Sequence, residues 1–192
     1  MFKVIRVVLL LLFLASVALG AWRTQTRSVE WKYALPINLY LINGDGSSAT
    51  ADYLQTLTAE DFRPIEKFMR DEAERYGHDD AATVELRMGG TIVSTPPAPP
   101  VNGNALQTII WSLNLRGWAF RHAETTGPGP QARMFLLYYD PATNARLDHS
   151  VGMQKGLIGR VKLFVSQRMD KQNCVIIAHE FLHTLLIRPS EV

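Results

Sequence analysis

The chain has 192 residues, of which 47% are apolar and 20% are charged, and its formal net charge is +2. This composition is typical of a globular domain with a sizeable core and excludes a disordered chain. A net charge so close to zero, without a cluster of Lys and Arg among aromatic residues, argues against nucleic acid as a partner. The single cysteine, Cys174, excludes an intrachain disulfide, and we interpret it as a small buried residue.

Residues 1–22 are predicted to be a targeting segment. Basic residues precede an apolar run from Val7 to Leu19, and small residues after it offer a cleavage site. The run is short for a membrane span, which favours a signal peptide, but the longer stretch 4–22 would make a short membrane anchor, so both alternatives stay open. Either one places the domain of residues 23–192 in the cell envelope, exported to the periplasm or beyond, or held outside the cytoplasmic membrane.

The first half of the domain predicts two strands with a helix between them. Tyr33 to Ile42 is rich in branched and aromatic residues, which favours a strand, and Asn43 to Gly46 predicts a turn. Residues 50–76 predict a short turn and then a main helix whose apolar side chains recur every three or four residues. Residues 83–88 alternate between polar and apolar side chains, which predicts a second strand. The proline-rich stretch 95–100 predicts a loop.

A second helix is predicted from Ala105 to Ala123. Its expected core residues are large and apolar: Leu106, Ile109, Ile110, Leu113, Trp118 and Phe120. Residues 133–139 predict a strand buried on both faces, residues 148–159 a glycine-rich loop, and residues 160–166 a last strand. This order of elements predicts a single α/β (α+β) domain in which a small mixed sheet is backed by helices.

An H-E-x-x-H pattern occupies residues 179–183, within an apolar run from Cys174 to Ile187. On a helix, His179 and His183 project from one face, close enough for both imidazoles to hold one ion. Two neutral imidazoles bind Zn²⁺ without cancelling its charge, and Glu180 beside them can take a proton from a water that the ion activates. The alternative is a core helix whose histidines are satisfied by neighbours, but two histidines at ligand spacing with an adjacent glutamate favour a metal site. The other faces of the helix are expected to enter the core, chiefly through Val175, Ile177, Leu182 and Leu185.

A late helix that carries this pattern, a small mixed sheet and a backing helix together resemble the zincin metallopeptidases. The stretch from about Leu147 is similar to exported bacterial zincins of the metzincin-like kind. The resemblance implies that His179 and His183 are zinc ligands and that Glu180 is the general base. It also implies hydrolysis of a peptide bond in a peptide or protein substrate, outside the cytoplasmic membrane.

The chain departs from that family after the second histidine. The metzincin-like pattern has a glycine three residues further on and a third ligand three beyond that, whereas this chain has Leu186 and Pro189. Glu191 and His149 are the candidates for a third ligand within the chain. Because two protein ligands hold zinc less securely than three, we expect weak zinc binding and low activity.

Two alternatives therefore stay open. One is a non-catalytic protein of the same fold, which acts as an envelope binding or structural protein with an incomplete metal site. The other is a zinc hydrolase that acts on a non-peptide amide of the envelope. The remaining histidines, His78 and His122, lie near predicted helix ends and are expected to be solvated.

Overall fold

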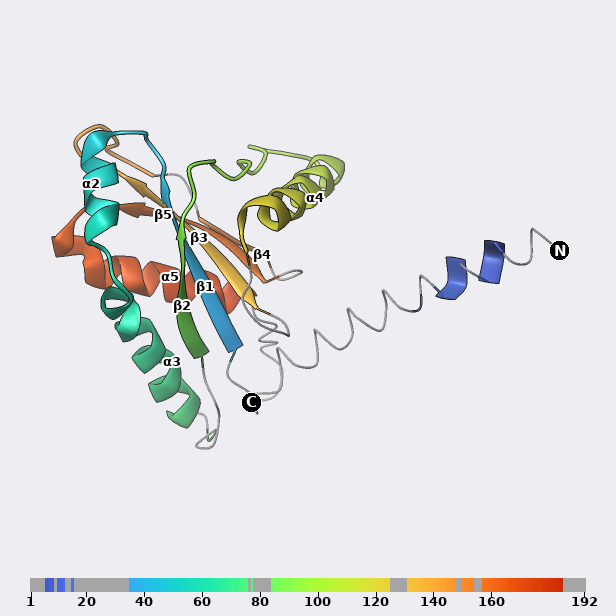
Figure 1. The fold of residues 1–192 in the computed structure, drawn as a ribbon, viewed down its shortest axis with the longest axis horizontal. Coiled ribbons are helices and arrows are strands. Elements are labelled where there is room, and N and C mark those ends of the chain that lie inside the picture. Colours follow the sequence, from blue (N-terminus) through green and yellow to red (C-terminus); the bar gives the residue numbers. More distant parts are fainter. Residues whose placement is uncertain are drawn as a thin grey trace.

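A five-stranded mixed sheet forms the centre of the domain (Figure 1). The computed structural model describes residues 6–8, 10–12, 15, 35–75, 77, 84–124, 131–147, 150–153 and 157–184. The strands are β1 (Leu35–Asn43), β2 (Val84–Thr91), β3 (Ala132–Tyr139), β4 (Val151–Met153) and β5 (Ile158–Phe164), and they lie in the order β2-β1-β3-β5-β4. Only β4 pairs antiparallel with its neighbour. The predicted single α/β domain with a small mixed sheet is confirmed.

Helices cover both faces of this sheet. Three helices, α2 (Ser48–Thr56), α3 (Arg63–Arg75) and α5 (Asp170–Thr184), contribute to one apolar core, and α4 (Ala105–His122) packs on the opposite face. Two short 3₁₀ helices, η1 (Ala59–Phe62) and η2 (Gln167–Met169), lead into α3 and α5. Short α/β connections of this kind bring each helix back over the sheet, as expected for parallel strands.

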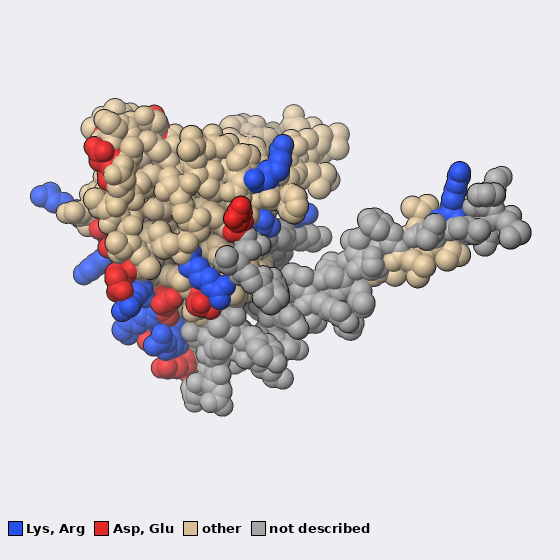
Figure 2. Space-filling model, viewed as in Figure 1, with Lys and Arg blue, Asp and Glu red and all other residues tan. Residues whose placement is uncertain are grey.

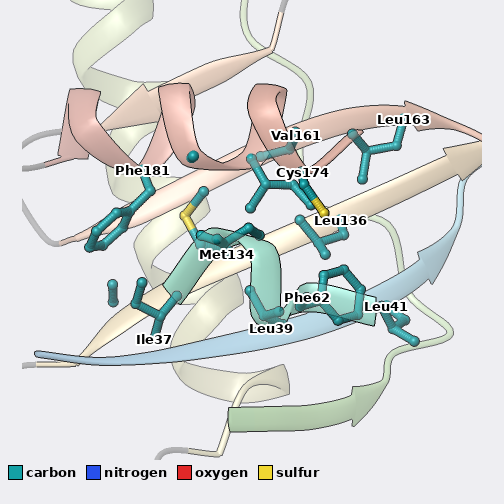
Figure 3. Packing of buried hydrophobic residues seen from close by; sticks show 14 of the residues in the cluster. Ile37, Leu39, Leu41, Phe62, Met134, Leu136, Val161, Leu163, Cys174 and Phe181 are labelled. Atoms are coloured by element: carbon teal, nitrogen blue, oxygen red, sulfur yellow. The ribbon is translucent and has the colours of Figure 1, made fainter. Parts of the chain in front are cut away.

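The larger core lies between the sheet and the layer of α2, α3 and α5 (Figure 3). The middle strands contribute alternate side chains to it, including Ile37 and Leu39 from β1 and Met134 and Leu136 from β3. Phe181 of α5 is fully buried against them. Because β1 and β3 are covered on both faces, their sequences are almost continuously apolar, as predicted for residues 133–139.

The segment predicted as a short turn and a helix over residues 50–76 forms two α-helices with η1 between them. The turn at Thr58 is stabilised by its own side chains, since the Thr58 backbone N–H donates to the Asp61 carboxylate at 2.7 Å. The apolar positions of α3 that point to the sheet are buried, among them Ile65 and Met69. The amphipathic pattern therefore predicted the buried face correctly, although it did not separate α2 from α3.

The predicted core face of α4 is wrong. Of the six expected core residues only Trp118 is buried, and Leu106, Ile109, Ile110, Leu113 and Phe120 are exposed. The helix packs on the sheet through the opposite side, with Trp111, Leu115 and Ala119 beside Trp118. Both sides of this helix are apolar, so periodicity alone could not choose between them.

The glycine-rich segment predicted as a loop contains strand β4. Val151 pairs with Arg160 and Met153 with Ile158, so β4 forms an antiparallel edge beside β5. A strand of three residues that includes a glycine is too short to show the alternation of apolar and polar side chains, so its sequence cannot be distinguished from that of a loop.

Of the predicted targeting segment, residues 1–22, the structure describes only residues 6–8, 10–12 and 15. In the part of the chain that the structure describes, no helix combines the length and the apolar character that a bilayer crossing requires.

Candidate metal-binding site

The candidate site lies on helix α5, which positions all three residues of the H-E-x-x-H pattern. The helix starts at Asp170, whose carboxylate accepts a hydrogen bond from the Tyr53 hydroxyl at 2.6 Å. Asp170 has helical dihedral angles and belongs to the first turn, where a carboxylate interacts favourably with the helix dipole. This contact joins the start of α5 to α2.

The buried face of α5 fixes which way the pattern points. Its buried members are Asn173, Cys174, Ile177, Ala178, Phe181 and Thr184. Ile177 was predicted correctly and Leu182 is half-buried against the core, but Val175, which was expected in the core, is 69% exposed. Leu185 lies outside the described residues. The predicted burial of Cys174 is confirmed, and its thiol lies 3.4 Å from the Asp61 carbonyl oxygen.

The two histidines of the pattern lie side by side on the exposed face. The Nε2 atoms of His179 and His183 are 3.0 Å apart, and the ring planes are nearly perpendicular, at 87°. Two imidazole nitrogens that share one tetrahedral zinc, at bonds of about 2.05 Å, lie about 3.3 Å apart. The observed pair is therefore close to the separation that a shared ion requires.

Glu180 lies at the junction between α5 and the sheet edge. The backbone of Gly152 in β4 approaches it so closely that a Cβ at Gly152 would lie 2.6 Å from the Glu180 carbonyl oxygen and 2.9 Å from the His183 Cβ. The same position would be 3.5 Å from the Glu180 carboxylate oxygen Oε2. Only a residue without a side chain permits this contact. Gly152 thus brings the edge strand against two of the three pattern residues.

Sequence reasoning did not single out Gly152. The only signal was its place among several glycines between Asp148 and Gly159. The local sequence does not show whether a glycine is required by a turn or by close packing against a helix. Close packing of this kind depends on a segment that is distant in the sequence.

The donor set in the described residues consists of the two imidazoles. Among those residues, no group of three His, Cys, Asp or Glu side chains is arranged to hold a metal ion. The third-ligand candidates Glu191 and His149, as well as Leu186, Pro189 and His78, lie outside the described residues. The two imidazoles fit two positions of a zinc site by type and by separation.

His122 has a different environment. Its ring stacks on Trp118 with centroids 4.8 Å apart, and its Nδ1 lies 2.9 Å from the Trp118 carbonyl oxygen. It belongs to α4, on the face of the sheet opposite to α5, and it is exposed as predicted. His122 is therefore separated from the candidate site by the sheet.

No protein-family model, no curated protein and no solved structure gave a significant match to this chain.

Proposed function

We propose that this chain is a zinc-dependent hydrolase of peptide bonds that acts outside the cytoplasmic membrane. The observation that carries the proposal is the paired imidazoles of His179 and His183, 3.0 Å apart, with Glu180 between them in the sequence. A core helix has no need to place two histidines together on its exposed side. The same pair beside a carboxylate is what hydrolytic zinc chemistry uses.

His179 and His183 would bind the ion, and Glu180 would accept and transfer the proton. A bound zinc ion supplies positive charge that acidifies water and polarises a carbonyl group. Glu180 would accept the proton of the attacking water and return it to the leaving amine, because one carboxylate can act first as base and then as acid. Its half-buried position against β4 restricts the directions in which the carboxylate can point.

The edge strand supports a peptide as the substrate. Within the described residues β4 pairs with β5 alone, so its outer edge offers backbone N–H and C=O groups to another extended chain. Gly152 lies in the middle of this strand and against Glu180 and His183. A peptide paired with the edge would therefore pass beside both residues.

The affinity for zinc is expected to be low for a catalytic site. With two protein ligands the ion retains extra waters and is oriented less firmly towards Glu180, which lowers both zinc affinity and turnover.

Zinc titration against a competing chelator tests the metal part of the proposal. His179→Ala and His183→Ala should each weaken zinc binding at least tenfold, the usual scale for loss of a ligand or its support. His122→Ala is the matched control, because it removes an exposed histidine from the other face of the sheet. Equal zinc affinity in the wild type and in both pattern variants would reject the site.

Cleavage of an unstructured protein such as casein tests the enzymatic part. Glu180→Gln should keep zinc affinity and lower turnover by about 10²-fold or more, the range for loss of general acid–base catalysis. Glu74→Gln, an exposed change on α3, should leave both unchanged. Zinc binding without any turnover that depends on Glu180 would instead favour the non-catalytic envelope protein.

The same assay identifies any further ligand. Zinc held at nanomolar affinity with full turnover would mean that another residue completes the site, and Glu191→Ala and His149→Ala would show which one.

A further inference from the structure

The side chains of strand β4 alternate between the two faces of the sheet, as in any strand. Gly152 faces α5, where a Cβ would lie 2.9 Å from the His183 Cβ. Val151 and Met153 therefore point to the other face, where both are half-buried against the apolar cluster between the sheet and α4. An extended chain that pairs with the outer edge of β4 must follow the same alternation.

This alternation assigns a face to three consecutive residues of a paired peptide. A residue directly opposite Gly152 has its side chain on the α5 face, on the side of Glu180 and His183. The residues before and after it have their side chains on the α4 face, level with Val151 and Met153, because neighbours across two strands share a face. The assignment is the same for a parallel and an antiparallel peptide.

The surroundings of Val151 and Met153 favour apolar side chains. Figure 2 shows charged side chains mainly over α3, which packs on the α5 face of the sheet. On the α4 face, Arg160 is the neighbour of Val151 across the two strands, but it is 5% exposed and already takes part in an interaction. The corresponding neighbour of Met153 is Ile158, which is fully buried. Burial of an apolar peptide side chain beside these residues is favourable, whereas a charged one would lose hydration.

We infer that the substrate has two apolar residues separated by one other residue, and that Val151 and Met153 recognise this spacing. The inference rests on the proposed function, because the peptide in question is the proposed substrate. Branched and aromatic side chains should fit best, since they pair well across strands. The middle residue lies opposite Gly152, nearest to Glu180 and His183. Hydrolysis is therefore expected at one of the two peptide bonds of this middle residue.

The test compares two fluorescent peptides that have the same composition and differ only in spacing. One contains Val-Thr-Val and the other Val-Val-Thr, each within the same sequence of Gly and Ser. The adjacent valines of the second peptide point to opposite faces of an extended chain, so only one of them can contact the α4 face. Binding to the full chain with Glu180→Gln is followed by fluorescence anisotropy, because the low turnover expected of this variant leaves the peptides intact.

The Val-Thr-Val peptide should bind about 1.5- to 5-fold more tightly, the scale of one side-chain pair across two strands. Val151→Ser and Met153→Ser should each bring the ratio of the two Kd values towards one. Val175→Ser is the matched control, an exposed aliphatic position on α5, and should leave the ratio unchanged. Equal Kd values with Val151 and Met153 both in place would overturn the inference. This comparison needs no change in β4, so it decides the matter even if a serine variant fails to fold.

Mass spectrometry of the products formed by the wild-type chain tests which bond is cleaved. Cleavage of the Val-Thr-Val peptide should occur at either peptide bond of the threonine. Cleavage that depends on Glu180 but occurs only at other bonds would overturn the inference and leave the proposed function intact. A spacing preference in binding without any cleavage would instead support the contacts at Val151 and Met153 and reject the proposed hydrolysis.

Discussion

Gly152 of β4 lies against Glu180 of α5 with no room for a side chain between them, since a Cβ there would be 2.6 Å from the Glu180 carbonyl oxygen. The contact joins the edge of the sheet to the helix that carries the histidine pair. It is made by backbone on both sides, which cannot move aside as a flexible side chain can. The position of the edge strand over the candidate site therefore depends on this glycine.

Replacement of this glycine should disturb both stability and the site. We expect Gly152→Ala to lower the free energy of unfolding by about 1–3 kcal/mol, the usual cost of overpacking, and to reduce turnover by displacing β4. Urea unfolding followed by circular dichroism measures the first effect. Gly117→Ala is the control, because its Cβ would meet nothing within 4 Å and alanine favours a helix. That change should be neutral or stabilise by up to about 1 kcal/mol. A Gly152→Ala protein as stable as the wild type would show that β4 is not held by this contact.

Phe181 is the main anchor of α5 in the core. It is fully buried, so Phe181→Ala should cost about 3–5 kcal/mol in unfolding free energy through lost contacts and the remaining cavity. Val175→Ala, on the exposed side of the same helix, should change stability by less than about 0.5 kcal/mol. Thermal and urea unfolding of the two variants give the comparison. Similar losses for both would mean that α5 does not pack as described.

Removal of metal should leave the fold intact. The apolar cores on the two faces of the sheet contain neither His179 nor His183, and both histidines are exposed. We therefore expect a chelator to abolish turnover while unfolding remains cooperative. The free energy of unfolding should fall only by the linkage term, about 2.7 kcal/mol when zinc was present at about 100 times its Kd, and Tm should fall accordingly. Loss of the circular dichroism spectrum on chelation would instead assign zinc a structural role.

The Cys174 thiol should react slowly in the native protein. Burial raises its pKa from 9.0 to about 11, and the nearby carboxylates Asp170 and Asp61 act in the same direction. At pH 8 the thiolate fraction is then about 100-fold lower than in the unfolded chain, and reaction with a disulfide reagent should slow at least in proportion. Comparison of the rate with and without guanidinium measures this.

The same shift predicts how stability depends on pH. A thiol whose folded pKa is raised holds its proton more tightly in the folded state, so its favourable contribution is complete below pH 9. It is lost as the pH rises from there to about 11. Cys174→Ser should remove this part of the alkaline loss. An unchanged pH profile in that variant would assign the loss to other groups.

Local pattern determined much of this fold by itself. The buried strand at residues 132–139 and the amphipathic α3 follow from the spacing of apolar residues, because the apolar positions in both segments are the ones that are buried. The spacing of His179 and His183 also follows from helical geometry alone, since residues four apart meet on one face. These features need information from only a few neighbouring residues.

Tertiary structure alone decided the rest. Helix α4 has two apolar sides, and which of them meets the sheet depends on how Trp111, Leu115 and Trp118 fit against Tyr40 and Phe135 of the strands. In the same way, Gly152 became part of the candidate site only because β4 and α5 converge. A local pattern records which residues avoid water, but the choice among apolar surfaces, and the contact between segments far apart in the chain, depend on shapes that exist only after the chain has folded.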